Sequence, residues 1–189
     1  AVGVGMSRVS GLPDAEFAHD GQITRRPIRA MTLSALAPRK GERLWDIGAG
    51  SGSISVEWCL AGGTAVAIEA KPSRAVNIRA NAAAFGVDHR LTVVEARAPA
   101  GLAGLPSPDA VFVGGGGNAA LYASLWPQLA SGCRLVANAV TLETEALLVA
   151  LQGQHGGSLT RIDMAVAEPL GRMQGWATAR PVVQWSVTR

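Results

Sequence analysis

From residue 27 onward, the sequence alternates between short apolar runs and helix-like stretches of about ten residues. Short apolar runs that end in glycine or polar clusters predict buried strands, and the stretches between them predict helices. Strands that alternate with helices form βαβ units, in which helices cover both faces of a parallel sheet. We therefore expect an α/β fold with strands at 43–47, 64–68, 91–94, 110–113, 134–139, 159–167 and 182–187, and with helices at 27–37, 53–60, 72–85, 119–130 and 142–151.

The last two predicted strands have no helix between them, so we expect an antiparallel pair at the edge of a mostly parallel, seven-stranded sheet. The 189 residues are 48% hydrophobic and 16% charged, which supplies enough apolar side chain for one ordinary domain and excludes a disordered chain. We expect a flexible lead-in at 1–12 and a single domain at 13–189. Ala1 in place of Met is compatible with a domain cut from a longer chain.

Charge, hydropathy and cysteine content narrow the function classes. No run approaches the ~20 apolar residues that a membrane helix needs, and residues 1–20 lack a secretion signal. Cys59 and Cys133 have no metal-ligand spacing, so we expect two buried free thiols, no metal site and a cytoplasmic protein. The formal net charge of +3 fits an anionic substrate, and no Lys/Arg block indicates nucleic-acid binding.

A glycine-rich loop, Asp46-Ile47-Gly48-Ala49-Gly50-Ser51-Gly52, follows the first predicted strand and opens a predicted helix. Glycine lets the chain turn sharply and lets a ligand approach the backbone closely. The next predicted strand ends at Glu69, whose carboxylate can accept hydrogen bonds from both hydroxyls of a ribose. The loop and Glu69 together indicate a nucleoside site.

The spacing of the loop separates the candidate cofactors. The dinucleotide fingerprint G-x-G-x-x-G needs a third glycine where this chain has Ser53, which disfavours a nicotinamide-dependent oxidoreductase but leaves it as an alternative. A tight strand-to-helix turn without a ligand is a second alternative, and a non-enzymatic binding module is a third. The pattern D-x-G-x-G-x-G with an acid at the next strand end resembles the Rossmann-like class I methyltransferases that use S-adenosylmethionine. This resemblance implies that Gly48, Ala49, Gly50, Ser51 and Gly52 pass under the methionine part of the cofactor, with Asp46 near its amino group.

The fourth predicted strand is followed by four glycines, 114–117, which leave room for a large, flat substrate. It lacks the Asn/Asp-Pro-Pro-aromatic run of enzymes that methylate amino groups of nucleic acids. A tRNA base methyltransferase nevertheless remains the main alternative, because it shares the cofactor loop.

Segments 11–17, 19–25, 114–117 and 138–144, taken with 45–52, resemble the decarboxylating corrin-ring methyltransferases of cobalamin biosynthesis. The resemblance runs from about residue 11 to the end of the chain. It implies methylation of C15 of a precorrin, a tetrapyrrole, and loss of the C12 acetate carboxylate. It also implies a homotetramer and a fused or partner C5-methyltransferase domain, since in some organisms this domain is the C-terminal half of a bifunctional enzyme.

The same resemblance places cofactor contacts at Thr24, at Glu69 and at Ala98, besides the glycine loop. Members often carry Gly-Asp-Ala-Pro after the third strand, where this chain has Ala96-Arg97-Ala98-Pro99. The acid that would bind the adenine amino group is absent, so the backbone at Ala98 is expected to contact the adenine and Arg97 is free for another role.

Candidate groups for the chemistry follow the fifth predicted strand. Asn138, Thr141 and Glu143 could orient the substrate, and Glu143 could transfer a proton. Thr141 and Glu143 also fit ordinary roles at a helix N-terminus. Because the substrate carries many carboxylates, we expect arginines around it, beside the open glycines. The candidates are Arg25, Arg97, Arg172, Gly114, Gly115 and Gly116, with Arg26 and Arg180 in the same arginine set.

Overall fold

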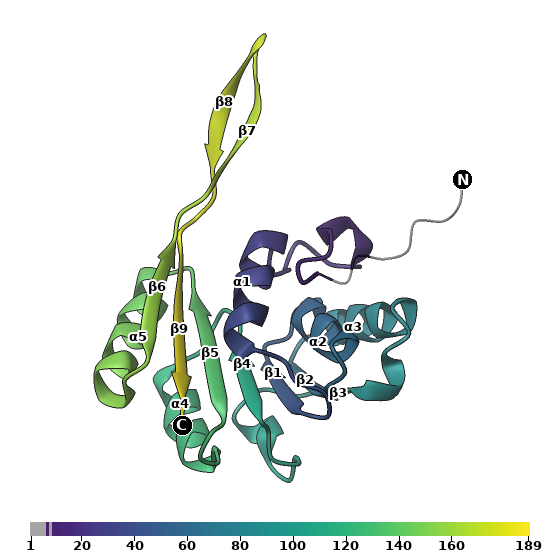
Figure 1. The fold of residues 1–189 in the computed structure, drawn as a ribbon, viewed down its shortest axis with the longest axis vertical. Helices are drawn as coiled ribbons and strands as arrows, with labels where there is room; N and C mark the ends of the chain where they lie inside the picture. The colour runs from purple at the N-terminus through teal and green to yellow at the C-terminus, as the bar shows by residue number, and fades with distance from the viewer. Residues whose placement is uncertain (1–6, 8) are drawn as a thin grey trace.

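Seven strands form the central sheet of the computed structural model, which describes residue 7 and residues 9–189 (Figure 1). Their order is β3-β2-β1-β4-β5-β9-β6. Strands β1 to β5 run parallel to one another, and β9 runs antiparallel to both β5 and β6. The predicted α/β fold with an antiparallel pair at one edge is confirmed. The strands are β1 (Arg43–Ile47), β2 (Thr64–Glu69), β3 (Leu91–Glu95), β4 (Ala110–Val113), β5 (Arg134–Ala139), β6 (Ser158–Ile162) and β9 (Val182–Thr188).

Five α-helices cover the two faces of this sheet (Figure 1). They are α1 (Arg26–Leu36), α2 (Ser53–Leu60), α3 (Pro72–Ala84), α4 (Ala119–Leu125) and α5 (Leu142–His155). The helix predicted at 119–130 ends early, and a 3₁₀ turn at Trp126–Gln128 follows it. Pro127 explains the difference, because proline has no N–H to continue the helical hydrogen bonds.

The core consists of two apolar layers, one on each face of the sheet. Successive side chains of a strand point to opposite faces. In β1, Trp45 and Ile47 therefore pack in the layer under α4 and α5, while Leu44 packs in the layer under α1, α2 and α3. This alternation directs Asp46 toward α2, on the same face as Leu44. Cys59 and Cys133 are buried free thiols, as predicted, and burial raises their pKa values to about 12 and about 11.

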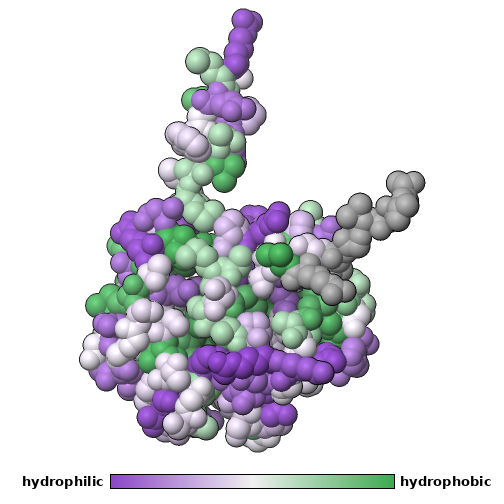
Figure 2. All heavy atoms as spheres, in the orientation of Figure 1, coloured by the Kyte–Doolittle hydropathy of each residue, from purple (hydrophilic) through white to green (hydrophobic). Residues whose placement is uncertain are grey.

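A hairpin that was not predicted from the sequence extends from the sheet. The strand predicted at 159–167 ends at Ile162, and its last three residues begin β7 (Ala165–Leu170). The loop expected before residue 182 contains the rest of β7 and β8 (Met173–Thr178). These two strands pair only with each other and project from the body as an arm, defined here as residues 165–178 (Figures 1 and 2). Every residue of β7 is exposed, so the arm lacks the buried-exposed alternation by which strands are recognised.

The N-terminal part of the described chain packs against the body of the protein, in contrast to the predicted flexible lead-in. Of the predicted lead-in, residues 1–6 and 8 lie outside the described residues. Gly11 and Leu12, however, are buried, and their N–H groups donate to the Glu57 carboxylate at 2.8 and 3.2 Å. They begin a segment, residues 11–25, that crosses α2 and α3 before α1 starts, and we call it the strap. Within the described residues, no helix is long and apolar enough to cross a membrane.

Candidate functional site

A cavity of about 1020 Å³ opens at the carboxyl ends of the parallel strands. Its walls come from the loops after β1, β2, β3 and β4, from the end of β5, from the strap and from the base of the arm. Ligands of open α/β sheets bind at this edge, where neighbouring strand ends diverge. Of the predicted site residues, those that line the cavity are Thr24, Arg25, Gly48, Ala49, Gly50, Glu69, Arg97, Ala98, Gly114, Gly115, Gly116 and Asn138.

The glycine loop is built so that side chains are excluded from it. Gly48, Gly50 and Gly52 have φ of +70°, +61° and +75°, which L side chains rarely adopt. A Cβ on Gly50 would lie 3.2 Å from the Gln22 carbonyl oxygen of the strap, and one on Gly52 would lie 2.8 Å from Ile78 Cγ2. The loop therefore offers bare backbone to a ligand, with the strap directly above Gly50.

Glu69 supports this loop and faces the cavity. Its carboxylate accepts the N–H of Gly50 at 2.9 Å with one oxygen and the N–H of Lys71 at 2.9 Å with the other. It is 6% exposed. Each carboxylate oxygen has a second lone pair, so both can still accept a hydroxyl of a ligand. Two neighbouring acceptors in a fixed orientation suit a vicinal diol.

Asp46 lies beneath the loop and does not line the cavity. Its Oδ2 accepts the Ser55 hydroxyl at 2.6 Å, and its Oδ1 has no hydrogen-bond partner. Burial raises the pKa of Asp46 to about 6, and the nearby Glu69 charge adds a smaller effect in the same direction. The predicted contact with a cofactor amino group would have to cross the loop backbone, because the alternation of β1 turns this side chain toward α2.

The four glycines after β4 fall into two kinds. A Cβ on Gly114 would lie 3.1 Å from the Gly48 carbonyl oxygen, and one on Gly117 would lie 2.9 Å from the Tyr122 hydroxyl, so these two permit close packing. Gly115 and Gly116 have open space in the Cβ direction. They keep the cavity wide beside the glycine loop, as the sequence predicts for a large substrate.

Asn138 is held in the wall by two side chains from other elements. Gln184 lies opposite it on β9 and donates to its Oδ1 at 2.9 Å and to the Thr32 hydroxyl of α1 at 3.0 Å. Asn138 Nδ2 donates to the same hydroxyl at 3.1 Å. All three are buried, and Asn138 is the one that lines the cavity. The triangle fixes the amide and leaves one N–H of Asn138 free to donate to a ligand.

Several predicted residues do not line the cavity: Asp46, Ser51, Gly52, Thr141, Glu143 and Arg172, and Arg26 of the arginine set. The Thr141 hydroxyl accepts the Thr144 N–H and caps α5, and Glu143 is exposed in the first turn of that helix. Val140 is the last residue of this connection to line the cavity. Arg172 is exposed in the turn at the tip of the arm (Figure 1). Local capping explains Thr141, and the unpredicted hairpin explains Arg172.

Four arginines line the cavity, and they differ in their partners. Arg74 donates to Asp20 of the strap at 3.0 Å, and this bond, together with Lys71, holds the pKa of Asp20 well below its usual range. Arg25 is 3.8 Å from Asp14. Arg97 and Arg180 make no ion pair with a described residue. Arg97 follows β3 and so lies on the Glu69 side of the cavity, whereas Arg180 precedes β9 and lies on the Asn138 side.

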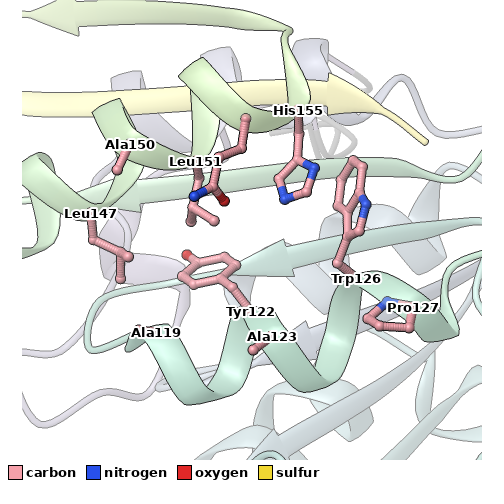
Figure 3. Close-up of a pocket in the computed structure, with 10 residues that line it drawn as sticks. Ala119, Tyr122, Ala123, Trp126, Pro127, Leu147, Ala150, Leu151 and His155 are labelled. Carbon is pink, nitrogen blue, oxygen red and sulfur yellow. The ribbon is translucent and has the colours of Figure 1, made fainter.

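A second, smaller hollow of about 400 Å³ lies between α4 and α5 (Figure 3). It is mainly apolar, and the rings of His155 and Trp126 stack along it with centroids 4.0 Å apart. Tyr122 and Leu147 point toward each other across it (Figure 3). None of the predicted site residues lines this groove, so the chemistry of the chain is concentrated in the larger cavity.

Comparison with known proteins agrees with this geometry. The family model described as precorrin methyltransferase domain matches residues 15–189. A precorrin-6Y C(5,15)-methyltransferase (decarboxylating) of Sinorhizobium sp. is 58% identical over 183 residues, which are 95% of this chain and 44% of that protein. A probable cobalt-precorrin-6B C(15)-methyltransferase (decarboxylating) of Pyrobaculum calidifontis is 34% identical, over 91% of this chain and 92% of that protein.

Solved structures show the same relation. The C-terminal domain of precorrin-6Y C5,15-methyltransferase from Rhodobacter capsulatus is 61% identical, has a TM-score of 0.95 and covers 97% of this chain and 100% of that one. An S-adenosylmethionine-dependent O-methyltransferase of Thermotoga maritima shares the fold at 16% identity, with a TM-score of 0.70 over 89% of this chain and 67% of that one. The chain spans about half the length of the first curated relative. With most of its length matched, the chain belongs to the precorrin methyltransferase domain family.

Proposed function

We propose that this chain transfers a methyl group from S-adenosylmethionine to C15 of a precorrin and removes the carboxylate of the C12 acetate, as a step of cobalamin biosynthesis. One observation carries the proposal: a single cavity joins a nucleoside-type donor end (Gly48–Gly50 and Glu69) to an acceptor end (Arg25, Gly114–Gly117, Asn138 and Arg180). The relatives named for this reaction match nearly the whole chain.

The residues of the donor end fit the proposed cofactor. Glu69 has the free lone pairs that the two ribose hydroxyls need, and Gly48 and Gly50 present backbone without a side chain to the cavity, where the methionine part would lie. The backbone at Ala98 lines the same end, where the adenine would lie. When bound, S-adenosylmethionine supplies an activated methyl group on its sulfonium sulfur.

The acceptor end has to hold a polyanion with C15 in line with that methyl group. Arg25 and Arg180 can bind peripheral carboxylates as charge-assisted pairs, and Gly115 and Gly116 leave space for the ring. The protein contributes mainly by orienting the two ligands, so that the methyl carbon and C15 are held close together and in line.

Decarboxylation follows from the electronic state of the methylated ring. Methylation at C15 leaves an electron-deficient ring that can accept the electron pair of the breaking C–CO₂ bond, and a proton then takes the place of carbon dioxide. The protein has to keep the departing carboxylate ionised and shielded from water. The free N–H of Asn138 lies where it can orient that carboxylate, whereas Glu143 is exposed and outside the cavity.

The test is mass spectrometry of the tetrapyrrole after incubation of this chain with S-adenosylmethionine and a reduced precorrin that retains the C12 acetate. We expect a product that gains one methyl group and loses one carbon dioxide. Methylation without decarboxylation would assign the second reaction to another protein. An unchanged tetrapyrrole would overturn the proposed acceptor.

We also propose that the chain assembles with copies of itself, as a tetramer by resemblance, and works in the cytoplasm beside a fused or separate C5-methyltransferase domain. The arm carries large exposed apolar side chains, with Trp176 at 77% and Met173 at 78% exposure. Such surface is usually covered by a partner. Light scattering of the wild type and of Trp176→Ser together with Met173→Ser should show a larger mass for the wild type. Equal masses would contradict assembly through the arm.

A further inference from the structure

Asn81 is a buried side chain of α3 that the proposed mechanism does not use. It is 2% exposed and does not line the cavity. Its Oδ1 accepts the Ala18 N–H at 2.7 Å, and its Nδ2 donates to the carbonyl oxygens of Ala18 at 2.9 Å and of Ser51 at 2.8 Å. Both N–H groups of the amide are therefore used, and all its partners are backbone atoms of segments outside α3.

The two segments that Asn81 joins both contribute residues to the wall of the donor end. Ser51 belongs to the glycine loop and follows Gly50, whose N–H is bound to Glu69. Ala18 belongs to the strap, which supplies Gln22 and Thr24 to the cavity. A Cβ on Gly50 would touch the Gln22 carbonyl oxygen at 3.2 Å, so the strap and the loop are already close there.

The other polar attachments of the strap hold mainly its ends. Arg29 is fully buried and donates to the carbonyl oxygens of Leu12 and Thr24, while it pairs with Glu57 at 2.5 Å. These contacts close the strap into a loop on α1 and α2. In the middle, the Phe17 ring stacks on the Phe85 ring with centroids 4.9 Å apart. This ring contact does not fix the distance between the strap backbone and the glycine loop.

The Arg29 guanidinium lies over the Phe17 ring, 4.8 Å from its centroid, and Asp20 pairs with Lys71 and Arg74 at 3.1 and 3.0 Å. Solvent reaches the ion-paired side chains of Asp20, Lys71 and Arg74, and ion pairs of this kind contribute little to a fixed geometry. Among the described residues, Asn81 is thus the buried polar side chain that forms hydrogen bonds with the middle of the strap.

We infer that Asn81 is a positioning residue of the donor site: it sets the distance between the middle of the strap and the glycine loop, and so the width of the space that the cofactor occupies. The inference rests on the proposed function for the identity of the ligand and on the hydrogen bonds of Asn81 for the geometry.

The experiment compares Asn81→Leu with Asn77→Leu. Asn77 lies one turn earlier on α3, is half-buried and makes no side-chain hydrogen bond with a described residue. For each full chain, calorimetry gives the Kd of S-adenosylhomocysteine, and hydrogen exchange without ligand gives the protection of the strap amides. We expect Asn81→Leu to raise the Kd at least about tenfold and to speed exchange at Ala18 and the following amides. Asn77→Leu should leave both within about twofold of the wild type.

A second variant covers the case in which Asn81→Leu does not fold. Asn81→Asp keeps the acceptor for the Ala18 N–H but cannot donate to Ala18 or Ser51, so it should also weaken S-adenosylhomocysteine binding. A Kd within twofold of the wild type for a folded Asn81 variant, with unchanged exchange of the strap, overturns the inference. Absence of binding by the wild type would overturn the proposed function instead, and the exchange data alone would then decide whether Asn81 holds the strap.

Discussion

The two ends of the cavity differ in the kind of protein atoms that line them. The donor end is mostly backbone: Gly48 and Gly50, both with positive φ, line it, and the carboxylate of Glu69 is fixed by two backbone N–H groups. The acceptor end consists mostly of side chains from segments far apart in the sequence, such as Arg25, Asn138 and Arg180. A backbone site depends on local geometry, while a side-chain site depends on packing between distant elements. Substitutions should therefore separate the two ends.

The largest difference between the effects on cofactor binding and on precorrin binding is expected from Gly50→Val. Its Cβ would lie 3.2 Å from the Gln22 carbonyl oxygen, so the branched side chain would displace the strap or the glycine loop, both of which line the donor end. We expect the Kd of S-adenosylmethionine, measured by calorimetry, to rise by about 100-fold, or ~3 kcal/mol. Precorrin binding should change far less.

The control for this variant is Gly86→Val. Gly86 also has a positive φ, +67°, but no atom lies within 4 Å of a Cβ there. Both variants carry a backbone strain of roughly 1–2 kcal/mol. Equal loss of cofactor affinity in the two variants would mean that strain, rather than the shape of the donor end, decides binding.

Charge reversal at Arg180 should have the next largest effect, at the opposite end. Arg180 lines the cavity on the Asn138 side and has no ion pair among the described residues. We expect Arg180→Glu to weaken precorrin binding, followed by tetrapyrrole fluorescence or absorbance, by about 30-fold, or ~2 kcal/mol. Cofactor affinity should be retained. Arg39→Glu, an exposed position outside the cavity, makes the same change of net charge and should leave both ligands unaffected.

Two further arginines test the expectations from the sequence. Arg97→Glu should weaken precorrin binding if Arg97 serves the substrate, but its place beside Glu69 suggests that cofactor affinity will fall instead. Arg172→Glu should leave a single-chain site unchanged, since Arg172 lies at the tip of the arm. Weaker precorrin binding by this variant would show that an arm reaches the cavity of a neighbouring copy.

The donor end was predictable because its signals are local in sequence. Gly48 to Gly52 stand between a strand and a helix, Glu69 ends the next strand, and the register of β1 with β2 brings the two together. The parallel sheet was predictable for a similar reason, since its buried strands stand out against the helices. The arm was not, because neither of its strands has a buried face.

The support of the acceptor end was not predictable in the same way. Asn138 could be proposed from its place after a strand, but Thr32 and Gln184 join it only when α1 and β9 pack on β5. Asn81 gave no signal either, because a single asparagine in a helix looks like surface until the strap lies over it. Thr141 and Glu143 are the opposite case: their place after β5 predicts a role in the chemistry, but neither lines the cavity and Thr141 caps α5.

A smaller effect is expected from Gln184→Leu, which tests whether the acceptor end depends on an oriented amide. Without Gln184, the Asn138 amide loses the donor to its Oδ1 and can rotate. We expect about a tenfold lower rate of decarboxylation, with methylated but undecarboxylated product accumulating and cofactor affinity within about twofold of the wild type. Mass spectrometry of single-turnover reactions gives the ratio of decarboxylated to undecarboxylated methylated product.

A double-mutant cycle shows whether Gln184 acts through Asn138. If it does, Gln184→Leu should cause no further loss in an Asn138→Ala background. Additive losses would mean that Gln184 has a separate role. Glu143→Gln completes the set: its exposed position predicts normal product at a normal rate, and accumulation of undecarboxylated product would restore Glu143 as the proton donor.

The smallest effect on ligands, and one confined to stability, is expected from Asp46→Asn beneath the donor end. Burial raises the pKa of Asp46 from 3.8 to about 6, so the folded chain binds this proton more tightly than the unfolded chain does. Stability from this group is therefore lost as the pH rises from about 4 to about 6, by up to ~3 kcal/mol. Asparagine cannot ionise, so the variant should gain stability relative to the wild type across that window. Urea unfolding at pH 4 and pH 7 measures the difference, and the exposed Asp88→Asn serves as the control. A difference that is the same at both pH values would show that Asp46 ionises as readily in the folded chain as in the unfolded chain.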